Sequence, residues 1–235
     1  MNHPHSSILD KLTHGFVSSC QPVDDGPMDR PSIVASMAVA SIAGGAAGLR
    51  IEGIDNLKAV RPLVTAPIIG IVKRDLPDSD VRITPFIEDV IALKNAGADI
   101  IAIDATHRKR PTEIAVLIEK IHQLGCLAMA DCSNYDEGMA AYKLGAEIIG
   151  TTMSGYVSGA VPTEPDFPFI TRLSDLGCFV MAEGRFNSPE LAYQAIKAGA
   201  SCVTVGSAIT RIEHICQWFD DAVRSAHNDK SEAIA

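Results

Sequence analysis

Predicted strands and helices alternate along almost all of this 235-residue chain. The predicted strands, which are short runs rich in Ile, Val and Ala, are Phe16–Cys20, Gly48–Glu52, Pro67–Lys73, Asp99–Asp104, Cys126–Asp131, Glu147–Thr151, Cys178–Glu183 and Cys202–Val205. The predicted helices are Pro31–Ile42, Asn56–Val64, Phe86–Asn95, Pro111–Gln123, Asp136–Leu144, Phe167–Leu176, Pro189–Ala198 and Arg211–Ala226. This order predicts an α/β fold in which helical crossovers join parallel strands.

Internal repeats indicate that the strands close into a barrel. Gly-Ala pairs beginning at Gly97, Gly145 and Gly199 each separate a helix from the next strand, where glycine suits a left-handed conformation. The segments L-G-C-L-A-M-A-D (Leu124–Asp131) and L-G-C-F-V-M-A-E (Leu176–Glu183) are offset by 52 residues, about two strand–helix units. Such repeats favour a symmetric (β/α)8 barrel, the TIM barrel.

An open, doubly wound sheet is the alternative fold. No G-x-G-x-x-G turn follows the first predicted strand, which argues against it. No break in composition divides the chain, so we expect one catalytic domain over residues 1–235. Residues 1–7 and 228–235 are expected to be flexible.

Composition excludes several classes of partner. The formal net charge of −9 argues against binding to nucleic acid or to an anionic membrane, although one local pocket can still be positive enough for a phosphorylated small molecule. The six cysteines form no C-x-x-C pair, which is typical of reduced, buried thiols. No signal region and no run of transmembrane length is present, so a cytoplasmic enzyme is expected.

Polar residues close every predicted strand. Chemistry in a (β/α)8 barrel takes place at these carboxyl ends, where the side chains converge. The residues concerned are Gln21, Arg50, Glu52, Lys73, Asp104, Asp131, Thr151, Glu183 and Ser207. A solvated rim of balanced charges is the alternative interpretation.

The segments after the last two strands predict a phosphate site. Gly184 and Gly206 allow close approach to the backbone, and Ser207 can donate a hydroxyl. Arg185 or Arg211 can supply positive charge.

Lys73 ends a buried run, P-I-I-G-I-V-K, and Glu183 ends another strand at the same mouth. Apolar surroundings and nearby Arg50 would lower the pKa of the lysine, whose neutral amine could act as a base or attack a carbonyl. A lysine and a carboxylate facing one substrate suit proton abstraction beside a carbonyl, which requires no redox cofactor. A surface lysine paired with Asp75 is the alternative.

Metal-binding signals are weak. His3 and His5 do not make a site by themselves, and no H-x-H or H-E-x-x-H pattern supports Asp104 and Asp131. The two aspartates are expected to bind sugar hydroxyls, so no metal is predicted.

Segments spread along the chain resemble the N-acetylmannosamine-6-phosphate 2-epimerase family. They are S-C-Q-P-V-D-D-G-P (Ser19–Pro27), G-L-R-I-E-G (Gly48–Gly53), P-I-I-G-I-V-K-R-D (Pro67–Asp75), R-I-T-P (Arg82–Pro85), D-A-T-H-R-K-R-P (Asp104–Pro111), M-A-D-C-S (Met129–Ser133), A-E-I-I-G-T-T-M-S-G-Y (Ala146–Tyr156), A-E-G-R-F-N-S-P (Ala182–Pro189) and V-T-V-G-S-A-I-T-R (Val203–Arg211).

The resemblance implies an isomerase that inverts carbon 2 of N-acetylmannosamine 6-phosphate to give N-acetylglucosamine 6-phosphate, in bacterial sialic-acid breakdown. It implies that Lys73 removes the carbon-2 proton and that Glu183 is the second catalytic group. The implied sugar ligands are Gln21, Arg50 and Asp131, and the implied phosphate ligands are Gly184, Arg185, Gly206 and Ser207, with Arg211 nearby. It also implies a homodimer contacting or exchanging the last helix, which carries Trp218 and Phe219.

Two rival functions remain open on the sequence. A Schiff-base aldolase would also use a lysine at a strand end, and a sugar-phosphate sensor would keep the pocket without turnover. The sequence also leaves open whether one residue or two handle the proton.

Overall fold

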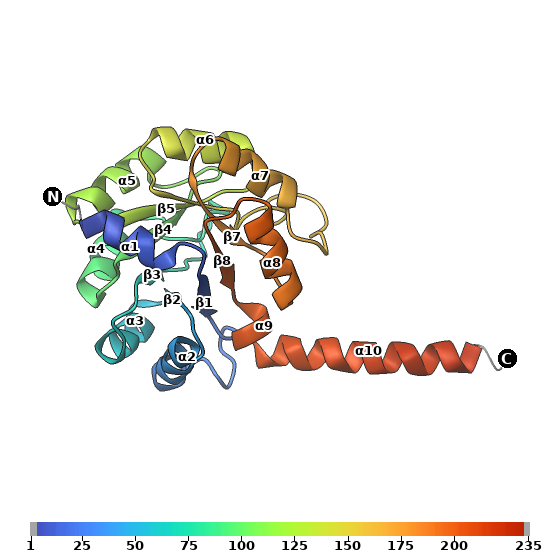
Figure 1. Cartoon of the computed structure of the whole chain (residues 1–235). Helices are drawn as coiled ribbons and strands as arrows, with labels where there is room; N and C mark the ends of the chain where they lie inside the picture. The colour runs from blue at the N-terminus through green and yellow to red at the C-terminus, as the bar shows by residue number, and fades with distance from the viewer. Residues whose placement is uncertain (1–3, 233–235) are drawn as a thin grey trace.

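Eight parallel strands close into a barrel in chain order (Figure 1). The computed structural model describes the backbone of residues 4–232 and the side chains of residues 7–227. The strands are β1 (Phe16–Cys20), β2 (Gly48–Glu52), β3 (Ile68–Ile71), β4 (Ile100–Asp104), β5 (Leu127–Asp131), β6 (Ile148–Gly150), β7 (Phe179–Glu183) and β8 (Cys202–Val205). The prediction of a single-domain (β/α)8 barrel is confirmed.

Helices surround the barrel. They are α1 (Pro4–Leu12), α2 (Pro31–Ala43), α3 (Ile54–Val60), the 3₁₀ turn η1 (Arg61–Leu63), α4 (Ile87–Ala96), α5 (Ile114–Gln123), α6 (Tyr135–Lys143), α7 (Phe167–Asp175), α8 (Pro189–Lys197), α9 (Ser207–Thr210) and α10 (Ile212–Glu232). The sequence did not predict α1 or the short α9. Residues 1–3 and 233–235 lie outside the described residues, so the expectation of flexible termini stays a prediction for them, and residues 4–7 and 228–232 belong to α1 and α10.

Alternation along the strands divides the core into two parts. One face of each strand fills the barrel, and the other packs against the helices. The interior side chains are mainly Val17, Ile69, Ile71, Ile100, Leu127, Met129, Ile148 and Met181, none more than 1% exposed. This filling closes the barrel, so a substrate can enter only above the last layer of side chains.

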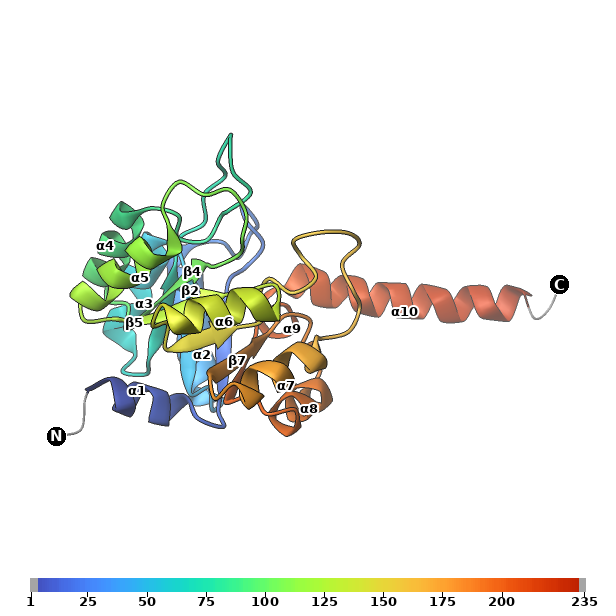
Figure 2. The same cartoon turned by 90° about the horizontal axis from the view of Figure 1, so that it is seen from above.

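The end of the barrel where the strands begin is covered by α1. Leu12 is fully buried and belongs to the interior cluster, together with Ile8 and Leu9 at its edge. Gly48 leaves room for it, because a Cβ there would lie 2.7 Å from Leu12 Cδ2. Figure 2 shows α1 at this end and the loop between β3 and α4 rising at the opposite end. The carboxyl ends of the strands are therefore the open end.

The last helix does not pack along the barrel. Figures 1 and 2 show α10 projecting away from it. Within residues 4–232, no helix is long and apolar enough to cross a membrane.

Candidate active site

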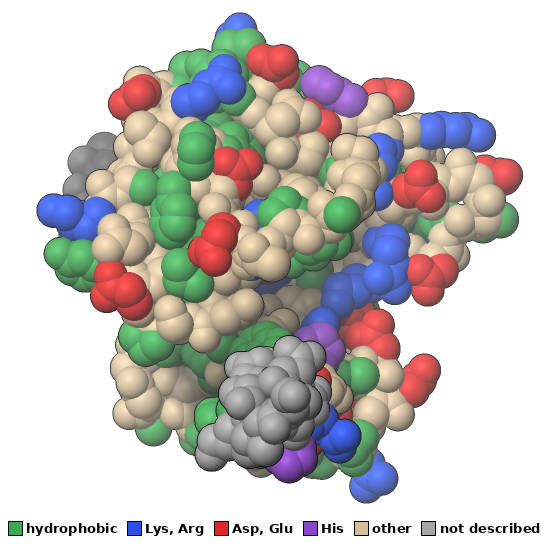
Figure 3. Space-filling model, turned by 90° about the vertical axis from the view of Figure 1, so that its right-hand side faces the viewer, with side chains coloured by type: hydrophobic (Ala, Val, Ile, Leu, Met, Phe, Trp, Pro, Cys, Tyr) green, Lys and Arg blue, Asp and Glu red, His purple; other side chains and the backbone are tan. Residues whose placement is uncertain are grey.

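A cavity of about 430 Å³ opens at the carboxyl ends of the strands. The predicted site residues that line it are Gln21, Arg50, Lys73, Glu183, Gly184, Arg185, Gly206, Ser207 and Arg211. Figure 3 shows the side from which α10 projects, with Lys and Arg side chains gathered beside a hollow in the surface. Of the ten residues to which the resemblance assigns a catalytic or binding role, nine therefore meet at one cavity, and the tenth, Asp131, is fully buried behind it.

Arg50 forms the floor of the cavity and is only 1% exposed. Its Nη2 donates to Asp131 Oδ2 at 2.6 Å, and its Nη1 donates to Glu183 Oε2 at 3.0 Å. Thr152 Oγ1 donates to Asp131 Oδ1 at 2.7 Å. Because both oxygens of the fully buried Asp131 are occupied, this carboxylate acts on the cavity by holding Arg50.

Gly150 on β6 makes room for this ion pair. A Cβ at Gly150 would lie 2.7 Å from Met129 Cε and 3.0 Å from Asp131 Oδ1. A real Cβ atom does not approach other atoms so closely without displacing them. The absence of a side chain here is therefore part of how the floor is built.

Glu183 is held at the end of β7 by its backbone and its side chain. Its N–H donates to Thr151 Oγ1 at 3.0 Å, and its carbonyl accepts from the same hydroxyl at 2.9 Å. Burial raises the pKa of Glu183 to about 6, with Asp131 acting in the same direction and Arg50 opposing it. The carboxyl group can therefore be protonated or ionised near neutral pH, as an acid–base catalyst requires.

Lys73 lies just beyond β3, which ends at Ile71 rather than at Lys73 as predicted. It pairs with Ile83 in an isolated antiparallel bridge, and its N–H donates to Glu52 Oε1 at 3.3 Å. Burial lowers the pKa of Lys73, and Arg211 and Arg50 act in the same direction against Asp24 and Glu52. The lowered pKa favours the neutral amine that could accept a proton.

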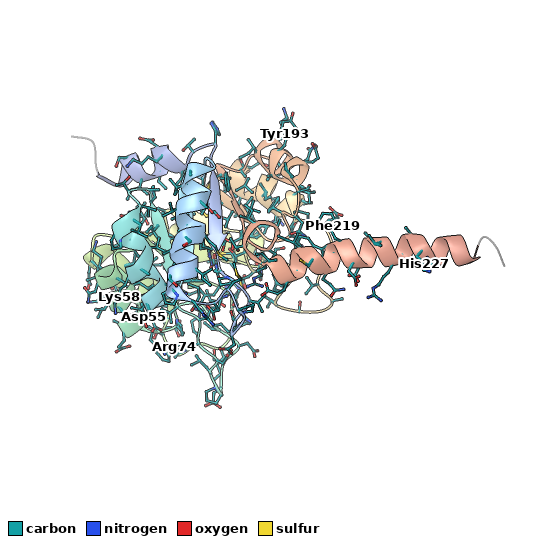
Figure 4. The ribbon with its side chains drawn as sticks, turned by 90° about the horizontal axis from the view of Figure 1, so that it is seen from below. Asp55, Lys58, Arg74, Tyr193, Phe219 and His227 are labelled. Atoms are coloured by element: carbon teal, nitrogen blue, oxygen red, sulfur yellow. The ribbon has the colours of Figure 1, made fainter. Side chains whose placement is uncertain are left out.

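The three charged residues that follow the buried run separate into different roles. Arg74, which is labelled in Figure 4, pairs through its Nη2 with Asp89 Oδ1 at 2.5 Å. Asp75 pairs with Arg82 at 2.7 Å, so the alternative in which Asp75 pairs with Lys73 is wrong. Among the side chains that the structure describes, none forms an ion pair with Lys73 Nζ. This leaves the amine free for a substrate.

The strand ends of β1 and β8 are joined through Gln21 and Arg211. Gln21 Nε2 donates to Ser19 Oγ at 2.7 Å, and Arg211 Nε donates to the Gln21 carbonyl at 3.0 Å. Thr210 Oγ1 donates to the Ser19 carbonyl at 2.7 Å. These bonds place the segment Gly206–Arg211 against the β1 loop, where Gly206 and Ser207 line the cavity.

Arg185 is positioned by contacts with another loop. Its Nε donates to the Glu164 carbonyl at 2.7 Å, and its Nη1 donates to the Ser154 carbonyl at 2.6 Å. The residue itself has φ +64°, directly after Gly184 at φ +105°. Two of its nitrogens are therefore already engaged before any phosphate binds.

Asp104 lines the cavity, and both oxygens of its carboxylate accept hydrogen bonds from its own loop. Oδ1 accepts from the Thr106 N–H at 3.0 Å and from Thr106 Oγ1 at 2.6 Å, and Oδ2 accepts from Arg108 Nη2 at 2.5 Å. Asp104 therefore shapes the loop after β4. The expectation that it binds sugar hydroxyls stays a prediction, and a sugar would compete with these hydrogen bonds.

Several cavity residues were not singled out from the sequence. They are Ser19, Asp80, Arg82, Ile83, Arg108, Thr152, Met153, Tyr156 and Thr204. Thr204 could have been found from the alternation of β8, because it lies two residues before Gly206 and so faces the same side of the strand. Ser19 lies on β1, and the others belong to loops, whose positions follow from contacts and not from a pattern in the sequence.

Among the described residues, no group of three or more His, Cys, Asp or Glu side chains could hold a metal ion. The side chains of His3 and His5 lie outside the described part of the chain. All six cysteines are free thiols, and only Cys216 is exposed.

Comparisons with known proteins point to one family. Residues 34–225 match the family model described as "Putative N-acetylmannosamine-6-phosphate epimerase". A protein of Photobacterium profundum named "Putative N-acetylmannosamine-6-phosphate 2-epimerase" is 68% identical over 235 residues, covering 100% of both chains. A Haemophilus influenzae protein of the same name is 63% identical over 222 residues, covering 94% of this chain and 97% of its own.

Solved structures agree with the fold. The N-acetylmannosamine-6-phosphate 2-epimerase from Clostridium perfringens superposes with a TM-score of 0.90 at 37% identity, over 94% of this chain and 99% of its own. A thiamine phosphate pyrophosphorylase from Pyrococcus furiosus, with a TM-score of 0.61 and 16% identity over 86% of this chain and 89% of its own, shares the fold alone.

Proposed function

The chain belongs to the N-acetylmannosamine-6-phosphate epimerase family, and from this membership we infer that it inverts carbon 2 of N-acetylmannosamine 6-phosphate to give N-acetylglucosamine 6-phosphate. It is a carbohydrate epimerase that acts in sialic-acid breakdown. The single observation that carries the chemistry is the unpaired Lys73 at a cavity whose opposite wall holds Glu183.

Lys73 is the base that removes the carbon-2 proton. This proton becomes acidic when carbon 1 is a carbonyl, and the charge that forms on its removal must be stabilised by neighbouring donors. The lysine suits this role because its pKa is lowered and no carboxylate ties its amine down. Arg50, on the cavity floor, is the nearest fixed positive charge to Glu183.

Glu183 is the second catalytic group, which returns a proton to carbon 2 or steadies the charge. Its pKa of about 6 lies close enough to neutrality for both protonation states to be populated. The two proton transfers leave the oxidation state of the sugar unchanged, so the reaction needs no redox cofactor.

The remaining residues of the cavity bind the substrate. Gln21, Arg50 and Arg211 contact the sugar, and Asp131 contributes by fixing Arg50. The phosphate is bound by Gly184, Arg185, Gly206 and Ser207, where glycine backbone can approach it closely. This assignment is supported by their common position on the β7 and β8 side of the cavity.

The chain forms a homodimer through α10. In a closed barrel the helix after β8 would pack beside β8 and β1, between α8 and α2, but α10 projects away from that position. Exposed apolar side chains lie along it, including Phe219 at 71% and Val223 at 70%. Figure 4 labels Phe219 on α10 and Tyr193, 59% exposed, on α8. A second copy would bury such surface.

The apolar composition of α2 on both its buried and its exposed face also supports a homodimer. The helix P-S-I-V-A-S-M-A-V-A-S-I-A has only serines as polar residues, yet Val39 is 43% exposed. A helix that is apolar all round is normally buried.

A cytoplasmic location is proposed on the free thiols, which persist in reducing compartments.

Proton NMR in heavy water tests the reaction. The purified protein is incubated with N-acetylmannosamine 6-phosphate, and the carbon-2 hydrogen and the gluco signals are followed. Gluco product carrying deuterium at carbon 2 is expected, because a solvent-exchanging base delivers the returning proton. No product and no exchange would contradict the proposal. Borohydride trapping with a keto or aldehyde substrate would then test the aldolase, and binding without turnover would indicate the sensor.

A further inference from the structure

Arg185 occupies a backbone conformation that arginine rarely adopts. Its φ of +64° is in the left-handed region, next to Gly184 at φ +105°. Non-glycine residues at such angles are uncommon and persist where surrounding contacts hold them. The side-chain contacts of Arg185 are therefore the place to look for the reason.

The guanidinium group bridges the two ends of the loop between β6 and α7. One bond goes to the Ser154 carbonyl near the start of this loop and the other to the Glu164 carbonyl near its end. The same guanidinium lies 5.3 Å from the centre of the Tyr156 ring. In Figure 2 the loop arches away from the barrel. Arg185 thus closes the base of a long surface loop.

The loop packs closely around this arginine. A Cβ on Gly155, which has φ +79°, would lie 2.5 Å from Pro162 Cδ and 3.2 Å from Arg185 Nη1. Ser154 Oγ donates to Asp166 Oδ2 at 2.7 Å, and Asp166 Oδ1 caps α7 by accepting from the Phe169 N–H. Arg185 is therefore tied to a loop whose two ends are themselves anchored.

The same loop forms a wall of the cavity. Met153 and Tyr156 line it together with Arg185. Arg185 Nη2 has no hydrogen-bond partner among the described side chains and backbone groups, so it can still bind an anion in the cavity. A planar guanidinium can hold two carbonyls and an oxyanion at the same time, whereas a lysine amine cannot reproduce this geometry.

We propose that Arg185 is a positioning residue that couples an anion in the phosphate site to the loop Met153–Pro165, so that phosphate binding holds the loop against the substrate. The identity of the anion rests on the function proposed above. The position of the loop does not, because it follows from the contacts of Arg185 with Ser154 and Glu164.

Limited proteolysis with inorganic phosphate as the probe tests this. Chymotrypsin cleaves after exposed aromatic residues, and Tyr156 is 47% exposed in the loop. The fragment cut after Tyr156 is quantified by mass spectrometry, with the fragment cut after Tyr142, 40% exposed on α6, as the internal reference. In the wild type, phosphate is expected to slow cleavage after Tyr156 several-fold and to leave cleavage after Tyr142 unchanged.

Three variants separate anchoring from anion binding. Arg185→Gly is expected to fold, because glycine tolerates the positive φ, and to be cleaved after Tyr156 about tenfold faster with no protection by phosphate. Arg185→Lys keeps the charge but should also be cleaved faster. The matched control is Arg172→Ala, because Arg172 lies 4.1 Å over the Tyr135 ring away from the cavity, and should leave cleavage after Tyr156 unchanged.

Two results would overturn the proposal. If Arg185→Gly loses phosphate affinity by calorimetry but is cleaved like the wild type, Arg185 is a phosphate ligand only. If its cleavage rises but phosphate never protects the wild type, Arg185 is a fixed structural contact without coupling. Neither readout measures epimerisation, so failure here is distinct from failure of the proposed reaction.

Discussion

Arg50 Nη1 lies 3.0 Å from Glu183 Oε2, so the guanidinium on the cavity floor and the carboxyl group on its wall form one unit. Removing the positive charge would leave the fully buried Asp131 without its partner. The proposed acid–base group therefore depends on the charge of Arg50.

The first prediction concerns the pH dependence of turnover. The active enzyme carries one proton shared between Lys73 and Glu183, so kcat/KM should be bell-shaped with its acidic limb near pH 6. Below that limb both groups are protonated. Measuring kcat/KM between pH 4.5 and 9 checks the limb, and Glu183→Gln should lose it together with most of the activity. An unchanged acidic limb in Glu183→Gln would assign it to another group.

The same carboxyl group should affect stability. The folded pKa of Glu183, about 6, exceeds the ordinary value of 4.5. The resulting stabilisation is fully present below pH 4.5 and is lost as the pH rises through 6, by an amount on the order of 2 kcal/mol. Urea unfolding at several pH values should show Glu183→Gln gaining stability relative to the wild type between pH 4.5 and 7. A constant difference would contradict this.

Replacing Lys73 tests both its role as the base and its effect on the stability of the fold. Lys73→Met should reduce kcat by at least about 10³-fold, because no other lysine is among the described residues that line the cavity, while the fold stays intact. The lowered pKa of Lys73 means that the folded state binds its proton less well than the unfolded chain does, so stability rises with pH toward 10.5. Thermal unfolding of Lys73→Met at pH 7 should show equal or higher stability. Retention of most of the activity would remove Lys73 as the base.

Gly150 tests the construction of the floor. Gly150→Ala should push Asp131 and Met129 aside, lowering stability by about 1–3 kcal/mol and raising KM through Arg50. The matched control is Gly44→Ala, because Gly44 has φ −79° and its nearest atom to a new Cβ is at 3.4 Å. Denaturant unfolding and steady-state kinetics compare the two. Wild-type values for Gly150→Ala would contradict the packing argument.

The proposed dimer can be tested on α10. Phe219→Glu places a charge on the most exposed aromatic side chain of the helix and should shift the protein toward a monomer. Arg224→Ala is the control, because its partner Asp220 lies on the same helix and both are solvated. Light scattering after size-exclusion chromatography measures the mass. A wild-type mass for Phe219→Glu, or a monomeric wild type, would contradict the assembly.

The sequence predicted the barrel because strands and helices leave different periods in the chain. The ranges predicted for β1, β2 and β8 coincide with those observed. The strand predicted over Pro67–Lys73 ends early, at Ile71, because Lys73 turns out of the sheet to pair with Ile83. Helix α1 was missed because its apolar residues are few, and Leu12 is buried only because the barrel provides the place.

What the sequence determined by itself was the order of the elements and which residues stand at the strand ends, because both follow from local periodicity and from the direction shared by parallel strands. That brought Lys73, Glu183 and the glycines of β7 and β8 to one mouth. Only the tertiary structure decided which polar groups stay free there. Asp104 accepts hydrogen bonds from its own loop, and Asp131 is paired with Arg50. Lys73 Nζ has no ion-pair partner among the described side chains. The sequence does not show this difference, because Arg50 and Asp131 lie far apart in the chain.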